Sequence, residues 1–427
     1  MKTSEILNYI QNGSYDKAFA SLYSDVEAAK ERYINTINNF IELYGDRDAE
    51  LFSVPGRSEI SGNHTDHNHG KVIAAAIDLD IIAIASKNDE NCIRITSKGY
   101  REDNVDIGNL DTTAYKKGTS TALVAGTCAF FKEQSHNIGG FFAYTTSQVL
   151  SGSGLSSSAA FEVMVGNILN FFYNNNSITA VELAKIAQKA ENVYFGKPCG
   201  LMDQVACAVG GFVNIDFKNP AAPVVKKIDK SLADLGYSLC ITDTGGNHAD
   251  LTDDYASVPS EMKAIANALG ASVLRDVDEA EFYKNIPMLR KSYGDRAVLR
   301  AIHFFNENKR VDKQVAALND DDIYEFLLLV SSSGDSSFKY LQNVYTNKNV
   351  TEQGLSLALA LSSDYVTRVH GGGFAGTIQA FVPSEEIVEY KNTIESVFGA
   401  YSCKMLSVRN FGAVKLTTTG VDAPKTN

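Results

Sequence analysis

A segment rich in glycine and serine is the part of the sequence best suited to bind a phosphate group. It reads Val149-Leu-Ser-Gly-Ser-Gly-Leu-Ser-Ser-Ser-Ala-Ala-Phe161, and apolar residues then follow at helical spacing at Val165, Ile168, Leu169 and Phe172. This spacing predicts a helix with residues 156–158 in its first turn. The start of a helix carries unpaired backbone N–H groups and the positive pole of the helix dipole, so it attracts anions.

The same segment has a simpler interpretation, a serine-capped helix that follows a flexible turn. A Walker loop is excluded, because the Gly-Lys-Ser/Thr sequence that ends such a loop is absent. Gly152 and Gly154 would let a phosphate approach the backbone closely, and the three following hydroxyls can bind phosphate oxygens or a metal ion. Two further segments favour the phosphate-binding interpretation.

The second segment reads Gly56-Arg-Ser-Glu-Ile-Ser-Gly-Asn-His-Thr-Asp-His-Asn-His-Gly70. His64, Asp66, His67 and His69 are of the types that bind zinc, but no ligand outside the loop is evident. A polar loop that hydrogen-bonds the hydroxyls of a sugar explains the same residues better. A solvated loop without a ligand is the remaining alternative.

The third segment, Thr367-Arg-Val-His-Gly-Gly-Gly-Phe-Ala-Gly376, contains the pattern Gly-x-Gly-x-x-Gly. As a dinucleotide-binding fingerprint it should open a helix in a βαβ unit. A strand-like stretch, 377–382, follows instead. The segment therefore predicts a glycine-rich turn that supports a phosphate or nucleotide, or a plain tight turn.

These segments must be positioned by a chain of 427 residues, enough for two or three domains. Residues 1–48 are predicted to form two or three short helices, an N-terminal helical extension. Strands are predicted within 51–100 and at 140–149, 212–217, 377–382 and 413–417. Helices are predicted at 119–131, 179–193, 260–269, 295–308, 320–330 and 352–360, with a helix or turn at 201–211. Asn219, Pro220 and Pro223 mark the best domain boundary.

Composition and charge exclude several classes of function. Apolar residues make up 44% and charged residues 21% of the chain, as in an ordinary globular protein. A net charge of -12 and a pI near 5.1 argue against nucleic acid or an anionic membrane as a partner. The six cysteines form no Cys-x-x-Cys pair, which fits reduced thiols in the cytoplasm. We expect no signal peptide, no membrane span and no obligate protein partner.

Taken together, the motifs resemble the galactokinase family, within the superfamily of galactokinase, homoserine kinase, mevalonate kinase and phosphomevalonate kinase. The resemblance rests on Gly56-Arg57 with Gly62-Asn-His-Thr-Asp66, Gly154-Leu-Ser-Ser-Ser-Ala159, Ala190-Glu-Asn192 with Cys199-Gly-Leu-Met-Asp-Gln204, and Gly371-Gly-Gly-Phe374. Arg300-Ala-Ile-His303 followed by Glu307-Asn308 is similar as well. The motifs occur in the family's order from about residue 50 to 420.

The resemblance implies an α+β, two-domain sugar-kinase fold with its active site between the domains. We expect a helical extension over 1–48, an N-terminal kinase domain over 49–222 with the sugar and phosphate loops, and a C-terminal kinase domain over 223–427 with the third glycine-rich motif. The implied activity is ATP-dependent phosphorylation of galactose at the anomeric hydroxyl, giving α-D-galactose 1-phosphate. ATP is then the co-substrate and Mg²⁺ the cofactor.

The resemblance also implies roles for individual residues. Asp203 is expected to be the base for the anomeric hydroxyl, with Arg57 beside it to lower its pKa and stabilise the transferring phosphoryl group. Ser158 and Glu191 resemble the superfamily's magnesium-binding pair. Nucleotide binding is implied for Gly152, Ser153, Gly154, Leu155, Ser156, Ser157 and Ser158. Sugar binding is implied for Asn63, His64, Asp66, Gly200, Asp203 and Tyr255.

The sugar loop departs from the family pattern at Asn63, where glutamate is usual, and at His67, where tyrosine is usual. An amide can bond the C6 hydroxyl of galactose, but it lacks the charge-assisted bond, which is roughly twice as strong. A neutral Asn63 would also tolerate a C6 carboxylate. A kinase for galacturonate or N-acetylgalactosamine is therefore one alternative, and a non-catalytic galactokinase-like sugar sensor is another. His370, Ala375 and Ser153 are further departures, in the two glycine-rich motifs.

Overall fold

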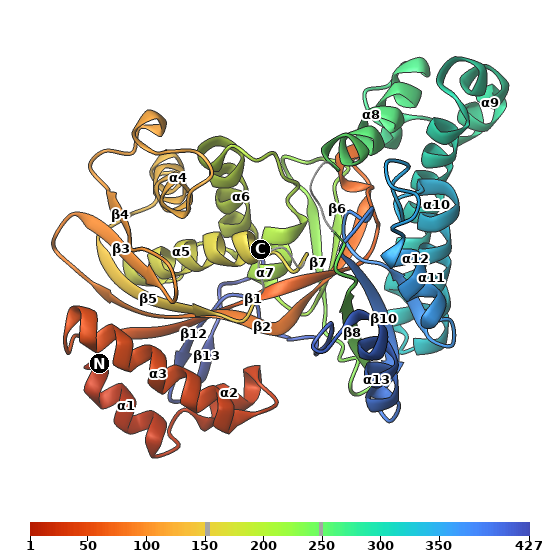
Figure 1. Cartoon of the computed structure of the whole chain (residues 1–427). Coiled ribbons are helices and arrows are strands. Elements are labelled where there is room, and N and C mark those ends of the chain that lie inside the picture. Colours follow the sequence, from red (N-terminus) through yellow and green to blue (C-terminus); the bar gives the residue numbers. More distant parts are fainter. Residues whose placement is uncertain (150–153, 247–250) are drawn as a thin grey trace.

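The computed structural model describes residues 1–149, 154–246 and 251–427. Gly152 and Ser153, which were predicted to bind nucleotide, lie outside the described residues. Figure 1 shows two parts, each built around its own sheet, with an additional group of helices at the N-terminus.

The larger part is built on a nine-stranded sheet with the order β13-β12-β1-β2-β5-β3-β4, in which β6 pairs with both β2 and β7. Its strands are β1 (Glu50–Ser61), β2 (Lys71–Lys87), β3 (Cys92–Ser97), β4 (Asp103–Asp106), β5 (Phe141–Ser147), β6 (Phe212–Asp216), β7 (Val224–Ile228), β12 (Val414–Thr417) and β13 (Gly420–Asp422). The antiparallel pair β1 and β2 shifts register between Pro55 and Arg57 and again between Glu59 and Ser61. Such irregularities re-aim side chains, and these two flank residues of the predicted site.

Helices cover both faces of this sheet (Figure 1). α4 (Ser120–Glu133), α5 (Ser157–Tyr173), α6 (Ala180–Ala190) and α7 (Met202–Val209) lie on one face. The N-terminal extension, α1 (Thr3–Gln11), α2 (Asp16–Leu22) and α3 (Val26–Tyr44), lies on the other face. The side chains of β2 point alternately to the two faces of the sheet and so contribute to two cores. Ile82 and Ile84 pack against the extension, while Ile81 and Ala83 pack against α4 to α7.

The smaller part has a four-stranded sheet with the order β11-β8-β10-β9. Its strands are β8 (Tyr237–Asp243), β9 (Val366–Val369), β10 (Thr377–Pro383) and β11 (Cys403–Leu406). Its helices are α8 (Thr252–Ala268), α9 (Glu279–Tyr293), α10 (Asp295–Asn319), α11 (Ile323–Ser336), α12 (Gly354–Leu361) and α13 (Ile387–Phe398). The turn between β9 and β10 carries the third glycine-rich motif, so a hairpin, and no βα unit, presents it.

The structure divides the chain differently from the predicted boundary at residue 222. β7 follows that boundary but pairs with β6 in the larger sheet. At the other end of the chain, β12 returns to pair with β1, and β13 extends that edge. Both strands are short and pair with residues distant in sequence, which local turn signals do not reveal. The smaller part therefore spans β8 to β11, and the last strands complete the larger part.

Most predicted elements are present, with differences at their ends. The apolar run at 72–85 lies within one strand, β2. α8 begins eight residues earlier than predicted, and α9 was not predicted. Both contain a proline, Pro259 and Pro287, which weakens a helix prediction from sequence. No described helix combines the length and the apolar character needed to cross a membrane.

Candidate functional site

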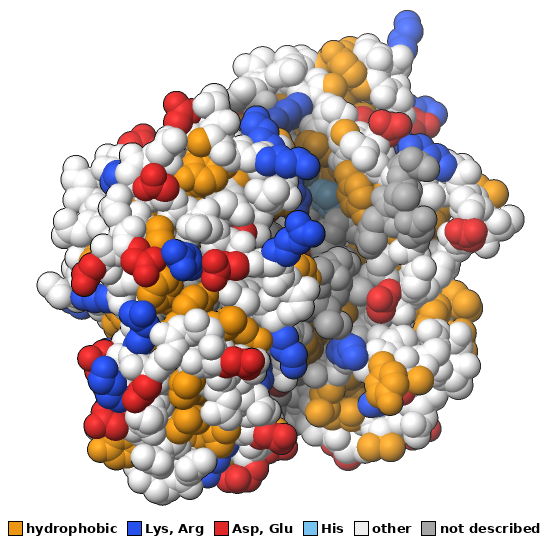
Figure 2. Space-filling view, turned by 60° about the vertical axis from the view of Figure 1, so that its left-hand side comes forward, with side chains coloured by type: hydrophobic (Ala, Val, Ile, Leu, Met, Phe, Trp, Pro, Cys, Tyr) orange, Lys and Arg blue, Asp and Glu red, His pale blue; other side chains and the backbone are white. Residues whose placement is uncertain are grey.

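A cleft of about 420 Å³ lies between the two parts of the molecule. The larger part contributes Arg57, Gly154, Ser156, Ser157, Ser158, Lys197 and Asp203, and the smaller part contributes Tyr255, His370, Gly371, Gly372, Gly373, Ala375, Gly376 and Thr377. The space-filling view in Figure 2 shows this hollow, with basic side chains along one rim. Residues from all three predicted segments thus meet in one cleft.

Arg57 and Asp203 form an ion pair in this cleft. Arg57 lies between the two register shifts of β1, and Asp203 lies in the first turn of α7. Nε of Arg57 donates to Oδ1 of Asp203 at 2.7 Å, and Oγ of Ser156 donates to Oδ2 at 2.5 Å. Arg57 also donates to the carbonyl of Gly154. The pair is therefore tied directly to the glycine- and serine-rich turn.

The environment keeps Asp203 ionised. Burial alone would raise the pKa of this carboxyl, but the charge of Arg57 and the hydrogen bonds from Arg57 and Ser156 outweigh it, so the pKa falls below its usual value. The predicted effect of Arg57 on the pKa of Asp203 is thus present. The Asp203 side chain is one-third exposed, so it can meet a ligand in the cleft.

The glycine- and serine-rich turn leads into α5 as predicted, but its serine does not cap the helix. Ser156 at the N-cap position has a left-handed backbone (φ 62°, ψ 53°), and its side chain makes no capping bond. The first N–H groups of the helix therefore remain available for an anion. Leu155 is buried, and its carbonyl accepts from the N–H of Arg57 at 3.1 Å, so this residue anchors the turn through its backbone.

Ser158, which lines the cleft, contacts Glu191. Oγ of Ser158 donates to Oε1 of Glu191 at 3.3 Å. Glu191 lies where α6 widens into a short π-helix, Glu191–Phe195, and it is buried. A hydroxyl and a carboxylate that converge beside a phosphate turn are hard oxygen ligands, so these two residues fit Mg²⁺.

Three polar residues to which the sequence analysis assigned no role surround Glu191. Nε2 of Gln204 donates to Oε2 of Glu191 at 2.9 Å and to Oε2 of Glu162 at 3.3 Å. Burial and the nearby charge of Glu191 raise the pKa of Glu162 well above its usual value. Nζ of Lys197 lies 3.6 Å from Oε1 of Glu191. Glu162 follows Ser158 by four residues on α5, and this helical spacing is the signal that could have found it.

Four predicted sugar-binding residues lie at or beside the cleft. A Cβ atom added to Gly200 would lie 2.4 Å from Oδ2 of Asp66, so the backbone there packs directly on the aspartate. A ring nitrogen of His64, Nε2, lies 2.9 Å from the carbonyl oxygen of Gly372. The hydroxyl of Tyr255 donates to the carbonyl of Gly373 at 3.0 Å. The sugar loop and the third glycine motif are therefore joined.

Asn63 occupies a different place, because it is fully buried away from the cleft. Its Nδ2 donates to Oε1 of Glu59 at 2.8 Å and to the carbonyl of Gly371 at 2.7 Å. Its Oδ1 accepts from Nδ2 of Asn343 at 2.8 Å and from Ser337 at 3.3 Å. Two donors and two acceptor positions are all that an amide side chain has. The expected bond from Asn63 to a sugar hydroxyl is therefore not supported, since protein groups already use the whole amide.

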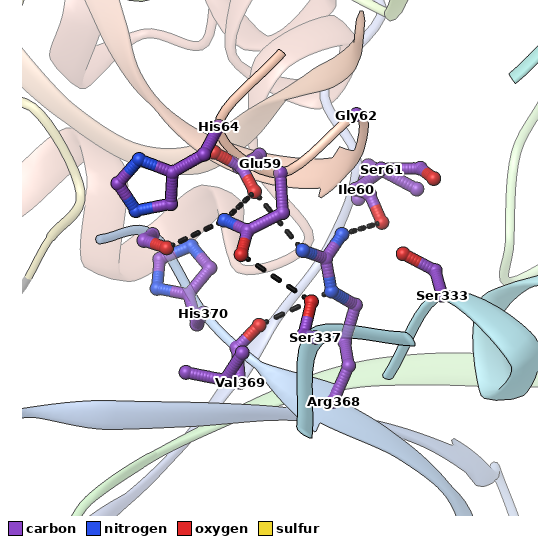
Figure 3. Close-up of polar contacts among 12 residues, drawn as sticks. Glu59, Ile60, Ser61, Gly62, His64, Ser333, Ser337, Arg368, Val369 and His370 are labelled. Atoms are coloured by element: carbon purple, nitrogen blue, oxygen red, sulfur yellow. Dashed lines mark hydrogen bonds and ion pairs between the residues drawn. The ribbon is translucent and has the colours of Figure 1, made fainter. Parts of the chain in front are cut away.

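The network around Asn63 joins the two parts of the molecule. Arg368 on β9 donates to Oε1 of Glu59 at 3.0 Å and to the carbonyl of Ile60, as Figure 3 shows. From α10, His303 bonds the carbonyl of Asn63 at 2.9 Å, and Glu307 accepts from the N–H of Gly62 at 3.0 Å. These bonds fix the loop that carries Asn63 to the smaller part of the molecule.

A zinc site in the histidine-rich loop finds no support. No group of three or more His, Cys, Asp or Glu side chains within residues 1–149, 154–246 and 251–427 is arranged to hold a metal ion. Nδ1 of His67 is paired with Nδ2 of Asn68 at 2.9 Å.

Comparison with known proteins gives the same family. Residues 122–211 match the model described as GHMP kinases N terminal domain, and residues 38–87 match the galactokinase galactose-binding signature. The galactokinase of Streptomyces coelicolor is 30% identical over 371 residues, which cover 86% of this chain and 92% of that protein. The galactokinase of Enterococcus faecalis is 29% identical over 384 residues, covering 86% and 94%.

Solved structures share the fold. The Lactococcus lactis galactokinase complexed with galactose aligns with a TM-score of 0.75 at 23% identity, covering 90% of this chain and 100% of that one. A mevalonate kinase aligns with a TM-score of 0.57 at 14% identity, covering 84% and 98%. The predicted α+β fold of this superfamily is confirmed.

Proposed function

The chain belongs to the galactokinase family, and on that basis we propose that it transfers the γ-phosphoryl group of ATP to the anomeric hydroxyl of galactose, giving α-D-galactose 1-phosphate. The observation that carries the proposal is the contact between Arg57, Asp203 and Ser156 within the cleft. It places an ionised carboxylate and a fixed cation beside a turn with free N–H groups. Those are the groups that a phosphoryl transfer to a hydroxyl needs.

Asp203 is the proposed acceptor of the hydroxyl proton. Each oxygen of an ionised carboxylate can accept more than one hydrogen bond, so a sugar hydroxyl can bind Asp203 beside the donors already present. The lowered pKa makes Asp203 a weak base, which suits a loose transition state in which the proton leaves late. Its main contribution is then to orient the attacking oxygen and take up its proton.

Arg57 is the proposed electrostatic stabiliser of the transferring group. Its guanidinium is held by both Asp203 and the carbonyl of Gly154, so it is already in position before the reaction begins. The free N–H groups at the start of α5 bind phosphate oxygens, together with the backbone at Gly154 and the hydroxyls of Ser157 and Ser158. Ser158 and Glu191 would hold Mg²⁺, which neutralises phosphate charge when bound.

The sugar would lie between the histidine-rich loop and the third glycine motif. His64, Asp66, the backbone at Gly200 and Tyr255 are the proposed contacts, together with Asp203. Asn63 gives no reason to prefer a C6 carboxylate, because its amide is committed to protein partners. We therefore put galactose ahead of galacturonate.

The test is ADP release by the purified protein with Mg-ATP and one sugar at a time: galactose, galacturonate, N-acetylgalactosamine or glucose. We expect turnover with galactose to be fastest, with a product phosphorylated at the anomeric position as identified by ³¹P NMR. Binding of galactose and ATP without turnover would instead support a sugar sensor.

The six cysteines are all free thiols, which supports a cytoplasmic location for the reaction.

A further inference from the structure

Lys197 lies in the cleft, yet neither the family motifs nor the mechanism above use it. It follows the π-helix Glu191–Phe195 and lines the cleft together with Ser158 and Asp203. Its side chain is 65% exposed, whereas that of its partner Glu191 is 3% exposed. An exposed lysine that points toward a buried carboxylate can leave that partner at little cost in its own hydration.

The charges in the cleft show what Lys197 is needed for. A triphosphate brings more negative charge than one divalent ion neutralises. Of the described residues that line the cleft, Arg57 and Lys197 are the arginine and the lysine. Arg57 is held by Asp203 and Gly154, and burial lowers the pKa of His370 to about 3, so this histidine is neutral. Of these two cations, Lys197 is therefore the one whose side chain can move to a new partner.

One oxygen links Lys197 to the metal site. Oε1 of Glu191 accepts from Ser158 at 3.3 Å and lies 3.6 Å from Nζ of Lys197. Lys197 would therefore compete with Mg²⁺ for Oε1 of Glu191. A lysine is a compact charge on a flexible four-carbon stem, so it can move from Glu191 to a phosphate oxygen nearby.

We propose that Lys197 is an exchanging counter-cation. It pairs with Glu191 in the empty enzyme, yields that carboxylate to Mg²⁺ when Mg-ATP binds, and then binds the terminal phosphates of the nucleotide. This inference rests on the proposed ATP-dependent transfer. It makes Lys197 a catalytic residue, because the same ammonium group stabilises the phosphoryl group during transfer.

The proposed exchange predicts that one variant binds the metal ion more tightly but binds ATP more weakly. Lys197→Met removes the competitor for Glu191, so a divalent ion alone should bind more tightly, by about threefold or more. The same variant loses a charge-assisted bond to phosphate, so ATP affinity and kcat should each fall by roughly tenfold. A residue that only supports the local structure would weaken both kinds of binding together.

The experiment uses Mn²⁺ as the metal probe, titrated without nucleotide and followed by the EPR signal of free Mn²⁺. ATP binding is measured by calorimetry with Mg²⁺ present, and turnover is measured with galactose. Lys197→Arg keeps the charge and should recover most of the ATP affinity. Lys339→Met is the matched control, because Lys339 is 60% exposed, pairs with Asp335 at 2.7 Å and is not one of the residues that line the cleft.

Tighter Mn²⁺ binding with weaker ATP binding in Lys197→Met, and neither change in the control, supports the proposal. Unchanged or weaker Mn²⁺ binding overturns it, as does unchanged ATP binding. The two binding measurements need no phosphorylated product. They therefore remain decisive if galactose is not turned over, which would count against the proposed function alone.

Discussion

Nε of Arg57 lies 2.7 Å from Oδ1 of Asp203, although 146 positions separate the two residues in sequence. β1 carries the arginine to the cleft, and the first turn of α7 carries the aspartate. Ser156 holds the second carboxylate oxygen. The pair therefore connects a strand, a helix and the glycine- and serine-rich turn. Replacing a single carboxylate oxygen of Asp203 can test its chemistry.

Replacing one carboxylate oxygen tests the role of Asp203. Asp203→Asn keeps the size and polarity of the side chain but removes its ability to take a proton. We expect galactose binding to be retained and kcat to fall by roughly 10²- to 10⁴-fold, the usual contribution of a general base. Calorimetry with galactose and single-turnover kinetics separate the two effects. Unchanged turnover would show that another group accepts the proton.

The buried amide of Asn63 makes a second prediction, about stability. Asn63→Asp would place a carboxylate 2.8 Å from Glu59 and remove the donors to Glu59 and Gly371. We expect a loss of about 3 kcal/mol or more in the free energy of unfolding, because buried partners lose their bonds and like charges face each other. Urea unfolding followed by circular dichroism measures this loss.

The control for that experiment is Asn104→Asp, at an exposed position of β4. Its cost should stay within about 0.5 kcal/mol, as for most surface substitutions. Equal losses in the two variants would contradict the interdomain role of Asn63. If Asn63→Asp folds stably and binds galactose more tightly, the side chain at position 63 does contact the sugar.

A buried histidine predicts how stability depends on pH. Burial, the largest cause, lowers the pKa of His303 from 6.5 to about 4. The unfolded chain therefore takes up this proton at a higher pH than the folded chain. The stability that His303 contributes is fully present above pH 6.5 and is lost as the pH falls from 6.5 toward 4. His303→Gln should flatten that part of the stability curve.

Urea unfolding of the wild type and His303→Gln at intervals between pH 8 and 4 tests this sign. The variant is expected to be less stable at pH 8, because bonds to Ser336 and the carbonyl of Asn63 change. The difference between the two proteins should then shrink on acidification. Part of the slope should persist, since His370 is also buried with a lowered pKa. Parallel curves would show that His303 does not cause the slope.

The contact between Arg57 and Asp203 was predictable, because the motifs contain the residue types that the proposed chemistry needs. Arg57 contacts Asp203, and Ser158 contacts Glu191, as the resemblance implied. Lys197 was not predictable, since an exposed lysine has no pattern that separates it from other surface lysines. Its significance comes from the 3.6 Å approach to a buried carboxylate, which only the folded chain shows.

The direction of a side chain was the hardest property to predict. β1 shifts register between Glu59 and Ser61, just before the loop that carries Asn63. Such a shift changes the direction in which the following side chains point. The motif therefore identified the loop correctly but did not predict the contacts of Asn63. The return of β12 to β1 was missed for a related reason, because pairing between distant strands leaves no local signal.

The last prediction concerns the N-terminal extension, which is joined to the sheet by buried charges. Asp80 on β2 is fully buried and accepts from Arg32 of α3 at 2.5 Å and from Arg409 at 3.1 Å. Arg32 also bonds the side chain of Gln148 at 2.7 Å, at the end of β5 and just before the phosphate turn. The extension therefore supports the strand that leads into the site.

Asp80→Asn would leave the buried Arg409 and the half-buried Arg32 without a charged partner, so we expect a loss of about 3–5 kcal/mol in the free energy of unfolding. Asp78→Asn is the control on the same strand, where one oxygen accepts only from the N–H of Ser407, and its cost should be about 1 kcal/mol. Urea unfolding compares the two variants. Equal costs would mean that the charges of Arg32 and Arg409 do not depend on Asp80, and that the extension is held mainly by its apolar core.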